Sequence, residues 1–115
     1  MIFITGNAYQ GKFEYAKANF TDGYQIINTF HKYVRKTMQQ GKDPLVETKN
    51  LMNRAILSKN ADKLVLISDE VGGGVVPVDD FEREFREING RVNCYLASCA
   101  EQVIRVTAGI GNRIK

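Results

Sequence analysis

The fold is decided near the start of the sequence, by Ile2-Phe3-Ile4-Thr5-Gly6-Asn7-Ala8-Tyr9-Gln10-Gly11-Lys12-Phe13. The β-branched and aromatic run before Gly6 predicts a short strand. A loop bounded by two glycines follows, and residues 12–19 are expected to form a helix. In a strand–loop–helix unit of this kind, the backbone N–H groups of the loop and of the helix N-terminus converge on one point, where they can bind an anion.

The spacing of this loop fits the phosphate-binding pattern G-x-x-x-x-G-K, without the final Ser or Thr. The glycines permit a tight turn, and Lys12 adds a positive charge for the terminal phosphates. Phe13 stands where a hydroxyl normally ligates Mg²⁺, which argues against a fully Mg²⁺-dependent reaction. The alternative is a glycine turn with Lys12 in solvent. The predicted nucleotide-binding residues are Gly6, Asn7, Ala8, Tyr9, Gln10, Gly11, Lys12 and Phe13.

Strand and helix patterns alternate along the rest of the chain. Helices are expected over residues 28–40, over 43–59 with Asp43 as N-cap and Pro44 at the first position, and from Asp79 onward with a capping-box pattern. Strands are expected over 63–68 and 102–108, with a further one beginning at Ile114, and residues 24–27 read either as a strand or as the approach to a helix. This order predicts an α/β, three-layer fold with a mainly parallel sheet.

A second glycine-rich motif follows the strand at 63–68 and reads Ser68-Asp69-Glu70-Val71-Gly72-Gly73-Gly74-Val75-Val76-Pro77. Because ligands bind at the carboxyl ends of parallel strands, we expect this motif to lie near the phosphate loop. Asp69 and Glu70 are candidate Mg²⁺ ligands or proton acceptors, and Lys12 and Glu70 are the candidate catalytic pair. The alternative is a solvated turn. The predicted site residues of this motif are Asp69, Glu70, Gly72, Gly74 and Pro77.

Several other charged residues have two readings each. His31, the one histidine, is either a nucleophile for phosphoryl or nucleotidyl transfer or an ordinary surface residue. Arg83, Arg86 and Arg91 either clamp phosphates or pair with glutamates on their own helix.

The composition is that of one soluble globular domain, residues 1–115. The net charge of +3 is spread along the chain without a basic stripe, which argues against nucleic acid as a partner. Apolar runs are too short to span a membrane and no signal-peptide pattern is present, so a cytoplasmic location is expected. Cys94 and Cys99 are expected to be buried thiols in a reducing compartment.

The second motif belongs to a longer pattern with a recognisable family resemblance. After it come Arg83, Phe85-Arg86, Gly90-Arg91, Asn93, Gly109-Ile110 and Lys115. These residues closely resemble the bifunctional adenosylcobinamide kinase/adenosylcobinamide-phosphate guanylyltransferase family, whose pattern reads roughly NEVGxGxVP, RxFR, GRxN and GI…K. The resemblance covers about residues 63–115 and 1–18. It implies a RecA-like P-loop NTPase fold, binding of GTP or ATP, a corrinoid substrate (adenosylcobinamide), a trimeric assembly and a role in cobalamin synthesis.

The chain departs from that family pattern in its middle. It is shorter, and the family segment with the guanylylated histidine has no counterpart; His31 does not lie in matching sequence. The family run D-C-L-T-x-W corresponds to Asn28-Thr29-Phe30-His31-Lys32-Tyr33, which puts Asn28 in place of an Asp that supports Mg²⁺. Asp69, in turn, stands where the family has Asn.

These departures leave two main hypotheses open. One is a working transferase, with both activities or as a kinase only, because Gly6, Gly11, Lys12 and Glu70 are retained. The other is a catalytically inactive relative that holds a nucleotide, a corrinoid or a protein partner, because Phe13 and Asn28 remove metal-supporting groups. A third reading is a structural domain with empty glycine loops.

Overall fold

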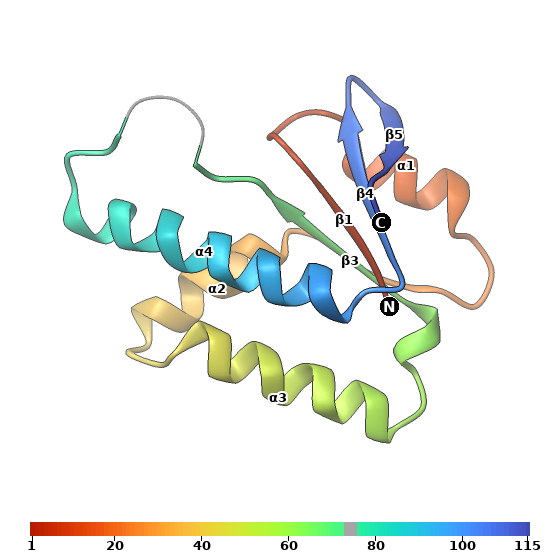
Figure 1. Ribbon diagram of the computed structural model, residues 1–115, viewed down its shortest axis with the longest axis horizontal. Helices are drawn as coiled ribbons and strands as arrows, with labels where there is room; N and C mark the ends of the chain where they lie inside the picture. The colour runs from red at the N-terminus through yellow and green to blue at the C-terminus, as the bar shows by residue number, and fades with distance from the viewer. Residues whose placement is uncertain (73–75) are drawn as a thin grey trace.

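A computed structural model describes residues 1–72 and 76–115 and shows a five-stranded sheet at the centre of the molecule (Figure 1). The strands are β1 (Ile2–Gly6), β2 (Gln25–Ile27), β3 (Leu64–Asp69), β4 (Gln102–Thr107) and β5 (Ile110–Arg113). Their order is β2-β3-β1-β4-β5, with every neighbouring pair parallel except the β4–β5 hairpin. The predicted α/β fold with a mainly parallel sheet is confirmed.

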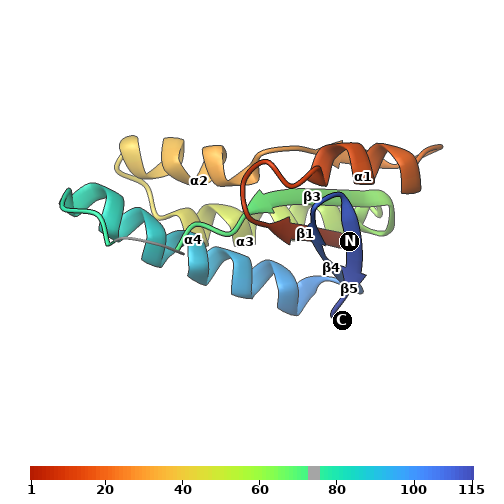
Figure 2. The same cartoon turned by 90° about the horizontal axis from the view of Figure 1, so that it is seen from above.

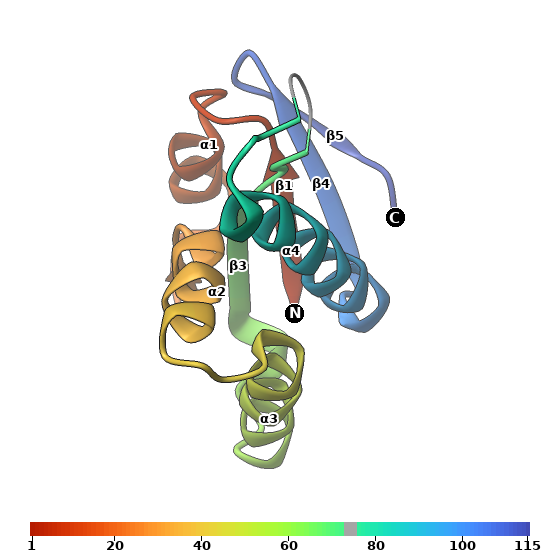
Figure 3. The same ribbon diagram turned by 90° about the vertical axis from the view of Figure 1, so that its left-hand side faces the viewer.

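Helices cover both faces of this sheet. They are α1 (Lys12–Asn19), α2 (Phe30–Gln39), α3 (Pro44–Leu57) and α4 (Asp80–Cys99), with a 3-10 turn at Ala61–Lys63. Figure 2 shows α1 on one side of β1 and β3 and α4 on the other. α2, α3 and α4 pack against one another. Figure 3 shows β5 at the edge of the sheet, next to β4. This is the three-layer arrangement that alternating strands and helices favour.

Two apolar cores result from the alternation of side chains along the central strands. Phe3 of β1 and the preceding Met1 face the core shared with α2, α3 and α4. Ile2 and Ile4 of β1 face the second core, under α1. β1 and β3 are buried on both faces, as expected for central parallel strands. The cores therefore fix the register of β1 against β3, which pairs Gly6 with Asp69.

Local signals set the helix ends. Asp43 caps α3 by accepting from the N–H groups of Leu45 and Val46, and Asp79 caps α4 in the same way. The capping box at α4 is only half formed, because the Glu82 carboxylate binds Arg35 of α2.

Three expectations from the sequence are wrong. The last strand is Ile110–Arg113 and ends before Ile114. Helical spacing predicts Ile56 of α3 on the same side as Leu45 and Met52, but Ile56 is 57% exposed. Cys94 and Cys99 are exposed: Cys94 lies on the face of α4 away from Val92 and Leu96, and Cys99 is the last residue of the helix, where Ala100 takes the buried position.

In the part of the chain that the structure describes, none of the helices is both long and apolar enough to cross a membrane.

Candidate functional site

The phosphate loop, residues 6–13, leaves β1 and turns sharply into α1. Three of its residues have positive φ: Gly6 (148°), Tyr9 (61°) and Gly11 (85°). Gly11 is also the N-cap of α1, so the loop ends at the helix N-terminus as predicted. Because glycine adopts these angles at little cost, Gly6 and Gly11 shape a loop whose backbone can approach a ligand closely.

Lys12, the first residue of α1, is the central cation of the site. Its side chain is only 7% exposed, and its Nζ lies 2.8 Å from Oδ1 of Asp69. The same Nζ donates to the carbonyl oxygen of Asn7, at 2.6 Å. The side chain of Lys12 is therefore buried. The alternative prediction, a glycine turn with Lys12 in solvent, is wrong about the position of this side chain.

His31, near the start of α2, is the third member of this cluster. Its Nδ1 accepts a hydrogen bond from the Asp69 N–H at 3.1 Å, and its Nε2 lies 3.4 Å from Oδ2 of Asp69. Burial, and the nearby charge of Lys12, lower the pKa of His31, although the Asp69 carboxylate acts in the opposite direction. The geometry fits a neutral imidazole with its proton on Nε2, and His31 is a part of the site rather than an unrelated surface residue.

Asp69 is held by its backbone as well as by its side chain. Its carbonyl oxygen accepts from Nδ2 of Asn89 at 3.1 Å and from Nδ2 of Asn93 at 3.2 Å, both on α4. The N–H of the next residue, Glu70, donates to the carbonyl of Gly6 at 2.9 Å, which continues the β1–β3 ladder into the loops. Both glycine-rich motifs thus meet at one edge of the sheet, as the parallel topology predicts.

Polar atoms gather on the α4 side of this junction. Thr5 and Ser68, which are register partners on β1 and β3, have buried hydroxyls without a hydrogen-bond partner among the described residues. The same holds for the Oδ1 atoms of Asn89 and Asn93. Asn89 is fully buried and was not singled out from the sequence, although a polar residue within the apolar stripe of a helix is a signal that could have found it.

Two further contacts fix the surroundings of the loop. Glu70 is paired with Arg105 of β4, with 2.9 Å between Oε2 and Nε. Gln10 binds the turn of the β4–β5 hairpin twice: its Oε1 accepts from the Ala108 N–H at 2.7 Å, and its carbonyl accepts from the Gly109 N–H at 2.8 Å. The spacing of residues in the sequence predicts neither the contact between Gln10 and the hairpin nor the ion pair between Glu70 and Arg105.

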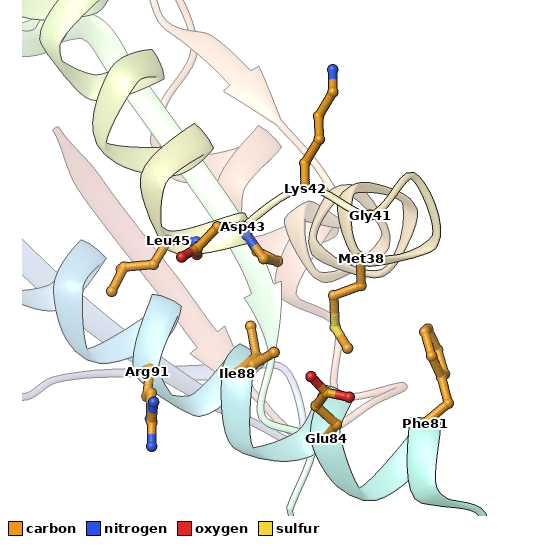
Figure 4. Close-up of a pocket in the computed structure, with 10 residues that line it drawn as sticks. Met38, Gly41, Lys42, Asp43, Leu45, Phe81, Glu84, Ile88 and Arg91 are labelled. Atoms are coloured by element: carbon orange, nitrogen blue, oxygen red, sulfur yellow. The ribbon is translucent and has the colours of Figure 1, made fainter.

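A pocket of about 360 Å³ lies over this cluster, between the loop and the start of α2. It is lined by loop residues from Ala8 to Glu14, by Asn28, Thr29, His31 and Lys32, and by Asp69. A larger pocket of about 490 Å³ lies between α2, α3 and α4; Met38, Phe81 and Ile88 point into it (Figure 4). Only the smaller pocket combines a helix N-terminus with a buried cation, so it is the candidate phosphate site.

The other predicted residues have separate positions. The Gly72 carbonyl accepts from Arg86, Pro77 lies between that loop and α4, and Gly74 is outside the described residues. Arg83 pairs with Asp80 and Arg91 with Glu87, one turn away on α4. Arg83 and Arg91 therefore follow the alternative of pairing within their own helix.

The residues present do not fit a Mg²⁺ ion held by the protein. The ring of Phe13 packs against the core under α1, with the Lys17 ammonium 4.4 Å from its centroid, and supplies no oxygen. Asp69 binds Lys12 and His31, and Glu70 binds Arg105. Within residues 1–72 and 76–115, no three His, Cys, Asp or Glu side chains form a group that could hold a metal.

Comparisons with known proteins identify the family of this chain. Residues 16–114 match the family model described as cobinamide kinase / cobinamide phosphate guanyltransferase. Two curated proteins, each called bifunctional adenosylcobalamin biosynthesis protein CobU, are 51% identical to this chain over 53 residues; one is from Salmonella typhimurium (strain LT2) and one from Escherichia coli (strain K12). The match covers 46% of this chain and 29% of each relative. Since the family model covers most of its length, the chain belongs to the cobinamide kinase / cobinamide phosphate guanyltransferase family.

Proposed function

We propose that this chain binds the terminal phosphates of GTP or ATP at residues 6–13 and serves phosphoryl transfer to a hydroxyl of a corrinoid of the cobinamide class. The observation that carries the proposal is the burial of Lys12. A lysine that is 7% exposed, at a helix N-terminus and at the carboxyl edge of a parallel sheet, supplies positive charge inside a pocket. Family membership supports the choice of a nucleotide as the ligand.

The individual groups fit binding better than they fit a full two-step reaction. Loop N–H groups and Lys12 would hold the phosphates, because the loop residues and Lys12 line the same pocket. Glu70 is the candidate proton acceptor for the substrate hydroxyl, although Arg105 holds it in this structure. Guanylyl transfer is the weaker part of the family's activity here, since the segment expected to carry the guanylylated histidine has no counterpart in this sequence. A trimer remains an expectation from the family resemblance.

A catalytically inactive relative is the second candidate, and one observation favours it. Phe13 and the engaged carboxylates leave the site without an oxygen set for Mg²⁺, and Mg²⁺ is the usual electrostatic partner in phosphoryl transfer. In that case the chain would bind a nucleotide, a corrinoid or a protein partner without turnover.

Calorimetric titration with GTP and with ATP, each with and without Mg²⁺, tests the binding. We expect Lys12→Ala to weaken binding at least tenfold, because it removes the buried cation. Lys17→Ala is the matched control, since it removes an exposed lysine from the same helix. Absence of binding by the wild type, or equal affinities of Lys12→Ala and wild type, would refute the proposal.

Transfer of the γ-phosphate of GTP or ATP to cobinamide, followed by mass spectrometry, separates the two candidates. Phosphorylated cobinamide supports the kinase. Nucleotide binding that is indifferent to Mg²⁺, with no phosphorylated product, supports the inactive relative.

A further inference from the structure

We propose that Asp69 is a specificity-determining residue of the phosphate site, whose carboxylate neutralises Lys12 in the free protein and disfavours phosphates that arrive without a bound cation. The inference rests on the proposed function, because it concerns ligands of the same loop. In this role Asp69 is a counter-ion of Lys12 and not a metal ligand.

The first step is the position of the carboxylate. Oδ1 of Asp69 is 2.8 Å from Nζ of Lys12, and the two side chains are 18% and 7% exposed. Both residues line the pocket that the phosphate would enter. A phosphate that binds Lys12 must therefore share it with Asp69 or displace the carboxylate from it.

The second step is that Asp69 has little freedom to move away. Its N–H is bound by His31, its carbonyl by Asn89 and Asn93, and its second carboxylate oxygen lies 3.4 Å from Nε2 of His31. Asp69 is also the last residue of β3, where it pairs in register with Gly6 of β1. The main chain of Asp69 is thus fixed, and Lys12 and His31 lie against its carboxylate, so the negative charge stays in the pocket.

The third step is electrostatic. Like charges a few ångström apart in a partly buried site repel strongly, because screening by water is reduced there. A polyphosphate that carries Mg²⁺ enters with less net negative charge, so the carboxylate repels it less. Asp69 therefore favours the cation-bound polyphosphate over the free one.

The test uses inorganic tripolyphosphate as the probe, titrated calorimetrically in EDTA and in Mg²⁺. We expect Asp69→Asn to bind tripolyphosphate in EDTA at least tenfold more tightly than the wild type, and to lose most of the wild type's preference for Mg²⁺. Glu87→Gln is the control, because Glu87 is an exposed carboxylate paired with Arg91 on α4, away from the site. Equal or weaker binding of tripolyphosphate by Asp69→Asn would overturn the inference.

Thermal melting gives a second readout, in which the expected change in Tm is opposite without and with ligand. Without ligand, Asp69→Asn should melt below the wild type, because Lys12 is left buried without its counter-charge. With tripolyphosphate in EDTA it should gain more in Tm than the wild type gains. Asp69→Ser, a smaller neutral residue, is measured in parallel so that failure of one variant to fold does not decide the result.

GTP titration of the wild type separates this inference from the proposed function. If the wild type binds GTP but Asp69→Asn and Asp69→Ser bind tripolyphosphate no better than it does, only the role of Asp69 is wrong. If the wild type binds no nucleotide and no variant binds tripolyphosphate, both proposals are wrong.

Discussion

Gly6 at the end of β1 lies so close to Val106 of β4 that a Cβ atom on Gly6 would be 2.5 Å from the Val106 carbonyl oxygen. The contact is between two backbones in adjacent strands, so neither can yield by rotating a side chain. The φ of Gly6 is +148°, which is also unfavourable for any residue with a Cβ. The first glycine of the phosphate loop is therefore required by the packing of the sheet as well as by the loop.

Gly6→Ala is expected to lower the free energy of unfolding by about 1–3 kcal/mol, the usual cost of forcing extra volume into a packed region. Chemical denaturation measures the change. Gly90→Ala is the control, because a Cβ at Gly90 meets nothing within 4 Å and α4 should gain about 1 kcal/mol from alanine. A Gly6→Ala protein as stable as the wild type would contradict the close approach of β1 to β4.

The ion pair between Arg35 of α2 and Glu82 of α4 predicts a specific pH dependence. The hydrogen bond from Arg35 lowers the pKa of Glu82 below its ordinary value. Since the folded-state pKa is the lower one, the pair stabilises the protein above the ordinary glutamate pKa, and this contribution is lost as the pH falls through the folded-state pKa. Denaturation midpoints of wild type and Glu82→Gln should therefore differ at pH 7 and converge in acid.

The comparison with Glu82→Gln cancels the titration of the other carboxylates. A difference that stays constant from neutral pH to acid would contradict the assignment. Arg35→Gln should cost more than Glu82→Gln, because the guanidinium also lies 4.2 Å from the ring centroid of Phe85 and loses that contact as well.

His31 is the one histidine of the chain, so its imidazole signals in NMR spectra are unambiguous. We expect the neutral form with the proton on Nε2, because Nδ1 accepts from the Asp69 N–H. Burial lowers the pKa of His31 below its ordinary value of 6.5. Below pH 6.5 the unfolded chain then binds a proton more readily than the folded one, so this residue makes stability fall as the pH drops toward the folded-state pKa.

Two-bond proton–nitrogen correlation spectra identify the tautomer, and a pH series gives the pKa. Lys12→Ala should raise the pKa of His31, because the Lys12 charge contributes to lowering it. A proton on Nδ1 would show that His31 does not accept from the Asp69 N–H as described, and a pKa above 6.5 would show that burial does not outweigh the Asp69 carboxylate.

Much of the fold could be predicted because its signals are local. Gly11 ends the loop and Lys12–Asn19 follows as a helix, and Asp43 before Pro44 marks the start of α3. The apolar run of β3 predicts burial on both faces, and the parallel topology predicts that the loops after β1 and β3 meet. These inferences need only neighbours in sequence and one rule of topology.

The contacts within the site could not be predicted in the same way. Which partner Lys12 or Glu70 finds depends on strand register and on the rotation of α4, and both are set by the packing of the whole core. The same limit explains the error at Cys99: its spacing continues the buried stripe of α4, but the helix ends there. The resemblance to a family included Asn93, yet its bond to the Asp69 carbonyl became evident only with α4 placed against β3.

The contact between Gln10 and the β4–β5 hairpin has a consequence for the order of folding. Gln10 and Ala108 are 98 positions apart in sequence, so the phosphate loop makes this contact only after the β4–β5 hairpin has left the ribosome. A contact of such long range forms slowly compared with a helix or a tight turn. The proposed nucleotide site is therefore complete only after the hairpin has been synthesised, and binding at that site would report that the loop and the hairpin have come together.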